Sequence, residues 1–184
     1  VTEERIACDF VRRGKLKVAC RPSHYEALAR NFELLHRDVD TQVELVPRER
    51  MRDELATDRY FGALLYKKSA QMHMGRFGRG LAQAAMRHGA LIHEHTPVER
   101  LERLGPSRHR LHTAAGAVEA DQVLLATGAT RHGQWSSFGF WRRRIIPVGS
   151  FILVTEPLGA LARQLFKHGR TYTNTVNIHH YFRL

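Results

Sequence analysis

The 184-residue chain is 43% hydrophobic and 26% charged, a composition that predicts a folded globular protein and excludes a disordered or disulfide-stapled one. Its 29 Lys and Arg outnumber 18 Asp and Glu, leaving a net charge of +11 that is spread along the sequence, which argues against a dedicated nucleic-acid-binding patch. No stretch approaches the roughly twenty apolar residues of a membrane span.

The first half of the chain has the pattern of alternating strands and helices. Strands are expected at residues 15–21, 42–46 and 61–66. A helix should begin at Pro22, where Ser23 and Glu26 have the spacing of a capping box, and a short helix should cover residues 47–55. The apolar residues of the first helix fall on one face, which should pack on a sheet: Tyr25, Leu28, Phe32 and Leu35.

A second series runs from residue 76 to residue 128. A helix rich in small residues should end at Gly89 in a left-handed conformation, followed by a strand at residues 90–93. Three short strands then predict an antiparallel meander, at residues 98–104, 108–113 and 117–120. The continuously apolar residues 123–126 suit a strand buried on both faces of a parallel sheet.

The final third should contain a long strand at residues 145–155, a helix at 158–166 and one or two strands within 172–184. The chain begins with Val1 rather than Met and stops within a strand-like pattern. We therefore expect it to be an internal segment of a longer protein.

The cysteines and histidines give no metal-binding pattern. Cys8 and Cys20 lack zinc-like spacing, which favours reduced thiols in a cytoplasmic protein. Two histidine pairs, His93 with His95 and His179 with His180, have no accompanying cluster of Cys, Asp or Glu. We expect no metal site.

Several blocks of the sequence together resemble a known family: CRPSHYEAL, GRGLAQAAMRHGALIHEHTPVERL, VEADQVLLATGA, IIPVGSFILVTEPL and HHYFRL. In this order and spacing they resemble the D-amino-acid oxidase superfamily of flavoproteins, most closely its members similar to gamma-glutamylputrescine oxidase. The resemblance covers nearly the whole chain. It implies an FAD-dependent oxidoreductase.

The resemblance implies a mixed α+β (α/β) chain with two kinds of domain. Residues 1–75 and 133–184 would belong to a substrate domain, a mixed sheet with helices. Residues 76–132 would be part of a Rossmann-like FAD-binding domain, comprising the helix, the strand, the β-meander and the buried strand. Its exposed edges would allow homo-oligomers.

The resemblance also implies contacts to FAD from four residues. The backbone at Val98 would meet the adenine end, and the turn Ala126, Thr127 and Gly128 would lie near the ADP moiety. Gly128 lacks a Cβ and lets a ligand approach, although it could equally serve only to end a buried strand. The G-x-G-x-x-G turn that grips the pyrophosphate is absent, because MGRFGRG has the wrong spacing and no acidic ribose partner.

The candidates for substrate binding are Tyr66, His73, Tyr181 and Arg183. Tyr181 and Arg183 alternate along one strand, so both can point into one cavity, where Arg183 could hold a substrate carboxylate by two hydrogen bonds. The alternatives are an exposed strand edge for this pair and a hydrogen-bonded interior position for His73. No side-chain base is assigned.

We therefore expect part of an FAD-dependent enzyme that oxidises a small amine or amino acid to an imine by hydride transfer to flavin. Without the phosphate-binding turn, the isolated chain should bind FAD weakly and be inactive. The alternative is a non-enzymatic basic module that binds nucleic acid or another anionic partner.

Overall fold

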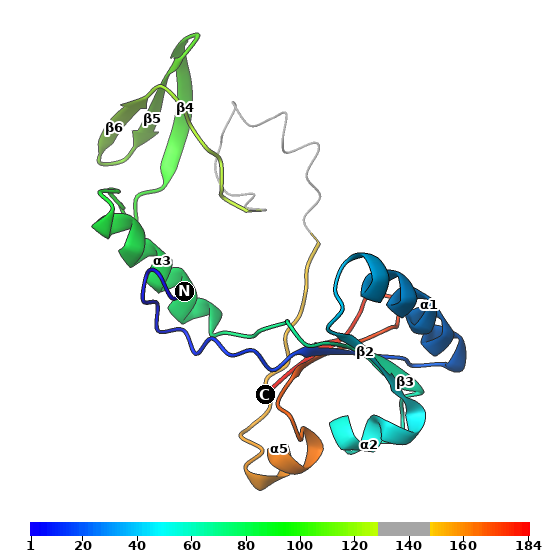
Figure 1. Ribbon diagram of the computed structural model, residues 1–184. Coiled ribbons are helices and arrows are strands. Elements are labelled where there is room, and N and C mark those ends of the chain that lie inside the picture. Colours follow the sequence, from blue (N-terminus) through cyan, green and yellow to red (C-terminus); the bar gives the residue numbers. More distant parts are fainter. Residues whose placement is uncertain (129–147) are drawn as a thin grey trace. The chain divides into compact units, whose positions relative to one another are not determined.

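The computed structural model describes residues 1–128 and 148–184, which divide into two compact units (Figure 1). The first unit comprises Val1–Ala90 and Thr155–Leu184, and the second comprises Leu91–Val154. The first contains a mixed sheet with helices and the second an antiparallel sheet, so the expected α+β class is confirmed. The domain boundaries expected after residues 75 and 132 remain predictions.

The first unit contains most of the helices and strands. Its elements are β1 (Lys15–Val18), α1 (Pro22–Asp38), β2 (Val43–Pro47), the 3-10 helix η1 (Arg48–Arg50), α2 (Met51–Glu54), β3 (Gly62–Tyr66), α3 (Met74–Arg87), α5 (Ala160–Leu165), β7 (Thr171–Asn174) and β8 (Tyr181–Phe182). The strands form one five-stranded sheet in the order β2-β3-β1-β7-β8. β1 pairs in parallel with β7, and the other neighbours are antiparallel.

Helices cover the two faces of this sheet (Figure 1). α1 packs against β2 and β3, where Leu28 and Leu64 are buried in one apolar cluster with the aromatic residues Tyr25 and Phe32 beside it. On the opposite face, buried residues of α2 and the strands form a second cluster: Leu16, Val18, Val46, Met51, Leu55, Ala63, Leu65 and Tyr172. The predicted amphipathic face of α1 is therefore confirmed.

α1 begins at Pro22 as predicted, but it is not capped as predicted. Arg21 is the N-cap and Pro22 occupies the first turn, with no side chain capping the helix. Proline is favoured at this position because its fixed φ angle suits a helix and it has no amide hydrogen to satisfy. The helix therefore begins before Ser23, and the predicted capping box between Ser23 and Glu26 is wrong.

A half-buried ion pair joins the two segments of the first unit, Val1–Ala90 and Thr155–Leu184, which are far apart in the sequence. Arg170 donates to Glu54 through Nε at 2.7 Å and through Nη2 at 3.2 Å. Its Nη1 also donates to the backbone oxygen of Arg13 at 2.6 Å. Because the Glu54 carboxylate is buried, removing Arg170 would leave an uncompensated charge, which costs far more than losing a surface ion pair.

The second unit is the predicted antiparallel meander. It consists of β4 (Val98–Gly105), β5 (Arg108–Thr113) and β6 (Gly116–Ala120). On one face, Glu119 accepts hydrogen bonds from Arg108 and Arg110, and these bonds hold the pKa of its carboxyl below the usual value. The meander is therefore stabilised mainly by the backbone hydrogen bonds between its strands and by exposed charge pairs.

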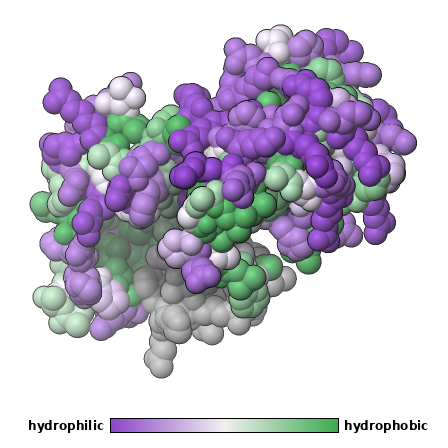
Figure 2. Space-filling model, turned by 90° about the horizontal axis from the view of Figure 1, so that it is seen from below, coloured by the Kyte–Doolittle hydropathy of each residue, from purple (hydrophilic) through white to green (hydrophobic). Residues whose placement is uncertain are grey.

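Three strand predictions are wrong within the described residues. Residues 90–93, 123–126 and 148–155 adopt irregular structure, and several of their apolar side chains are exposed, such as Leu91 at 87% and Phe151 at 95%. Exposed apolar surface is visible in Figure 2. A strand is held by hydrogen bonds from its neighbours, and no described strand pairs with these segments. Residues 145–147 lie outside the described residues.

Two glycines adopt backbone conformations that other residues rarely take. Gly89 has a φ of +90° just after α3, which confirms the predicted left-handed end of that helix. Gly62 has a φ of +129° at the start of β3. A Cβ at Gly62 would lie 2.4 Å from the Tyr25 ring and 2.9 Å from the backbone oxygen of Val46.

We predict that Gly62→Ala lowers the free energy of unfolding of the chain by roughly 2 kcal/mol or more, because the methyl group meets both a ring and a backbone atom. Gly78→Ala is the matched control. A Cβ at Gly78 has no described heavy atom within 4 Å, and alanine favours helix α3, so stability should rise by about 1 kcal/mol. Urea denaturation measures both. Equal effects of the two substitutions would contradict this packing at Gly62.

Candidate functional site

The pairing of the strands places a polar group of side chains on one face of the five-stranded sheet. Residues directly opposite each other in paired strands point to the same face. Lys15 lies opposite both Tyr66 and Thr171. One step along the strands, Lys17 lies opposite Leu64 and Thr173, and Thr173 lies opposite Tyr181. We call Lys15, Lys17, Thr171, Thr173 and Tyr181 the polar face.

The polar face continues the surface on which α1 packs. Leu64 and Tyr66, at its border, belong to the cluster beneath α1, whereas the lysines and threonines on β1 and β7 follow farther along the sheet. Most of its side chains are half-buried, Thr173 is buried, and Tyr181 on the edge strand β8 is 70% exposed. Polar side chains on a sheet face are suited to binding a polar ligand.

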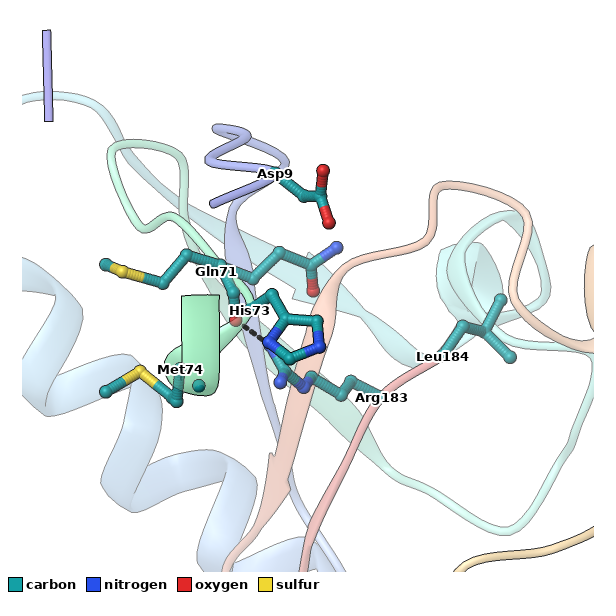
Figure 3. Close-up of a pocket in the computed structure, with 8 residues that line it drawn as sticks. Asp9, Gln71, His73, Met74, Arg183 and Leu184 are labelled. Carbon is teal, nitrogen blue, oxygen red and sulfur yellow. Dashed lines mark hydrogen bonds between the residues drawn. The ribbon is translucent and has the colours of Figure 1, made fainter. Parts of the chain in front are cut away.

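A cavity of about 450 Å³ adjoins the polar face within the first unit (Figure 3). It is lined by Asp9, Gln71, Met72, His73, Met74, Gly75, Arg183 and Leu184. Gln71 connects the cavity to the sheet, because its Oε1 accepts a hydrogen bond from the Thr171 hydroxyl at 3.3 Å and its Nε2 donates to the Gly169 backbone oxygen at 3.1 Å. The cavity and the polar face thus share a hydrogen-bonded boundary.

Arg183 and His73, two of the predicted substrate-binding residues, both line this cavity. Arg183 follows β8 and donates through Nη1 to the Met72 backbone oxygen at 3.1 Å (Figure 3). Its guanidinium has five N–H donors in all, so further donors remain for a carboxylate. The arrangement can bind an anionic group through a charge-assisted pair of hydrogen bonds.

Asp9 contributes the carboxylate of the cavity. It has a φ of +54°, an uncommon conformation outside glycine, and its Oδ2 accepts a hydrogen bond from Arg76 at 2.6 Å. Sequence reasoning did not select Asp9 or Gln71, because neither belongs to a motif and both reach the cavity through long-range contacts. Asp9 is thus held by a cation of α3, while Arg183 faces the same cavity.

His73 has a hydrogen-bonded structural role, but at the end of a helix rather than in the interior. It is the N-cap of α3, and its Nδ1 accepts a hydrogen bond from the Arg76 backbone amide at 3.2 Å. The side chain is exposed rather than interior. A polar side chain three residues before an unpaired amide, at the start of a helical pattern, is the signal that could have indicated this cap.

The two predicted tyrosines lie outside the cavity lining. Tyr66 is half-buried, which raises the pKa of its phenol, and Lys15 Nζ lies 4.8 Å from the centre of its ring. Tyr181 packs edge-on to His179 with ring centroids 6.3 Å apart. The structure therefore brings Arg183 and His73 together, leaves Tyr181 on the polar face and places Tyr66 at its border.

The residues predicted to contact FAD all belong to the second unit. Val98 pairs with Thr113 at the start of the meander. Gly128 has a φ of +63°, and a Cβ placed there would have no described heavy atom within 4 Å. The turn at Ala126, Thr127 and Gly128 is exposed, so its backbone is open to a ligand. The contacts of these four residues with FAD remain a prediction.

In residues 1–128 and 148–184, no three or more His, Cys, Asp or Glu side chains gather in a way that could hold a metal ion. None of the helices in this described part combines the length and apolar character needed to cross a bilayer.

Comparison with known proteins gives one family for the whole chain. The family described as FAD dependent oxidoreductase matches residues 1–184. The chain is 29% identical to the probable oxidoreductase OrdL of Haemophilus influenzae, covering 97% of this chain and 42% of that protein. It is 30% identical to gamma-glutamylputrescine oxidoreductase of Escherichia coli, covering 98% of this chain and 41% of that protein. The chain thus spans about two fifths of these relatives.

A solved structure shows the same fold. Glycine oxidase from Geobacillus kaustophilus superposes with a TM-score of 0.63 at 25% identity, covering 70% of this chain and 36% of that one. Most of this chain therefore shares its fold with part of a glycine oxidase.

We predict that His73→Ala lowers the free energy of unfolding by about 1 kcal/mol, because the Arg76 amide loses its acceptor. His73→Asn restores an acceptor at the same position and should recover most of the stability. Urea denaturation followed by helical circular dichroism measures the change. A loss that His73→Asn does not recover would show that the ring, and not the cap, stabilises this segment.

Proposed function

Because the chain belongs to the FAD dependent oxidoreductase family, we propose that it forms the substrate-binding side of an enzyme that oxidises an amine or amino acid. The observation that supports this proposal most is the cavity that Arg183 lines beside the polar face. The names of the E. coli relative and of the Geobacillus oxidase, which refer to an amine and to glycine, support an amine substrate.

FAD, when bound, supplies the acceptor for a hydride that leaves the carbon beside the amine nitrogen, and water then hydrolyses the imine. The residues of this chain bind and orient the substrate. Arg183 would hold a carboxylate through two parallel N–H donors, and Gln71 and Thr171 would fix the wall beside it.

The second unit would contact the adenine end of the cofactor. Val98 would approach it through the backbone, and Ala126, Thr127 and Gly128 would form a turn close to the ADP moiety. The open space at Gly128 supports this assignment, since a side chain would occupy the approach. The pyrophosphate would need a turn that these residues do not form.

Exposed apolar segments support the proposal that this chain forms only part of the flavin-binding domain. Residues 123–126 and 148–154 include side chains such as Leu124 and Leu153, exposed by 91% and 96%. Surfaces of this kind are normally covered by neighbouring strands or helices. In the longer arrangement of the relatives, we infer that further segments of the enzyme pair with these residues and complete the flavin-binding domain.

We predict that the 184-residue chain, mixed with FAD and passed through a gel-filtration column, loses the flavin and shows no amine-dependent oxidase activity. The physical reason is that the pyrophosphate has no cradle of backbone amides in this sequence. Absorbance of the protein peak measures retention. A tightly bound yellow cofactor would contradict the proposal that this chain lacks the phosphate-binding part of the FAD site. Steeply salt-sensitive binding to nucleic acid would instead favour a basic binding module.

We also predict that Arg183→Met weakens binding of N-methylglycine, an amine with one carboxylate, by about tenfold, the order expected for hydrogen bonds to a charged group. Arg163→Met, an exposed residue of α5, is the control and should leave the affinity unchanged. Calorimetric titration of the chain measures both. Identical affinities in the two variants would remove Arg183 from the substrate site.

A further inference from the structure

Lys17, Thr173 and Tyr181 form a continuous row across three strands of the first unit. Lys17 on β1 is opposite Thr173 on β7, which is opposite Tyr181 on β8. Neighbouring strands lie about 4.8 Å apart, so the side chains of such a row are in reach of one another. The row therefore presents an ammonium and two hydroxyls on one face of the sheet.

The charge of Lys17 is uncompensated in the part of the chain that the structure describes. Lys67 and Lys68 form ion pairs with Glu44 and Asp40, each at 2.8 Å, whereas the side-chain ammonium of Lys17 has no ion pair or hydrogen bond among residues 1–128 and 148–184. Lys15, its neighbour on the polar face, lies over the Tyr66 ring. Lys17 therefore places on this face a cation that no described carboxylate neutralises.

The middle residue of the row has an unused hydroxyl. Thr173 is 4% exposed, and its Oγ1 has no hydrogen-bond partner among the described residues. An unpaired buried hydroxyl costs free energy, which a ligand that accepts a hydrogen bond from it can recover. Lys17 and Tyr181, the residues on either side, are long and rotatable, so their movement can expose Thr173.

We propose that Lys17, Thr173 and Tyr181 form a second anion-binding subsite, which selects substrates that carry a second carboxylate in addition to the one held by Arg183. This inference rests on the proposed function, because it assigns the substrate class of the same site. Lys17 supplies the charge, and the hydroxyls of Thr173 and Tyr181 donate hydrogen bonds to the carboxylate oxygens. The preferred substrate is then an amine with a carboxylate at each end.

Two secondary amines of similar length test the subsite. N-(3-carboxypropyl)glycine has a carboxylate at each end, and N-butylglycine replaces one of them by a methyl group. In calorimetric titrations of the 184-residue chain, the dicarboxylate should bind about tenfold more tightly, the order expected for hydrogen bonding to a charged group. Lys17→Met should remove this advantage while leaving the affinity for N-butylglycine unchanged, and Lys17→Arg should retain it.

The matched control is Lys167→Met, which removes an exposed lysine in the turn after α5 and should preserve the tenfold preference. Urea denaturation verifies that each variant is folded. Equal affinities of the original chain for the two amines would falsify the subsite, as would a preference that survives Lys17→Met. If either of these results is found while N-butylglycine still binds in an Arg183-dependent manner, the proposed substrate site is supported and only the second subsite is refuted. If neither amine binds, both proposals fail.

Discussion

The pairing of β1 with strands on both of its sides is the constraint on which the fold and the candidate site depend. β1 pairs with β3 in antiparallel register and with β7 in parallel register, which brings together segments from opposite ends of the chain. Successive side chains of β1 point to opposite faces of the sheet, so Leu16 and Val18 are buried on one face and Lys15 and Lys17 lie on the other. A slip of one residue would exchange the two faces, so the apolar core fixes the positions of the polar side chains.

Local sequence patterns predicted the elements whose stability comes from their own residues or from near neighbours. The amphipathic spacing of α1 and the short strands of the meander are of this kind, and both are present. Residues 90–93 and 123–126 have equally apolar sequences, but a strand also needs partners, and sequence pattern does not show whether partners are available. At Ser23 the preference of Pro22 for the first helical turn overrode a local capping signal.

The chemistry of the site could be predicted only in part. An arginine in a strand-like pattern suggested carboxylate binding, and the structure places Arg183 just after β8, in the lining of a cavity. Asp9, Gln71 and Lys17 carry no local motif, and they reach the site through the sheet register and through contacts between distant segments. His73 was chosen for its chemistry, whereas its observed contact is a helix cap. Residue type therefore indicates what a side chain can do, and tertiary structure decides which groups act together.

The central claim is that this chain supplies the substrate-binding side of an amine-oxidising flavoenzyme. The most direct measurement uses a chimera in which residues 1–184 replace the matching segment of the E. coli gamma-glutamylputrescine oxidoreductase, which contributes the remaining three fifths of its length. The purified chimera is mixed without oxygen with a series of amines and amino acids, and the visible absorbance of its flavin is followed. We expect the folded chimera to retain FAD, and an amine carrying a carboxylate should reduce the flavin and remove its visible absorbance. A folded, flavin-loaded chimera that no amine or amino acid reduces would contradict a substrate-binding role for this chain.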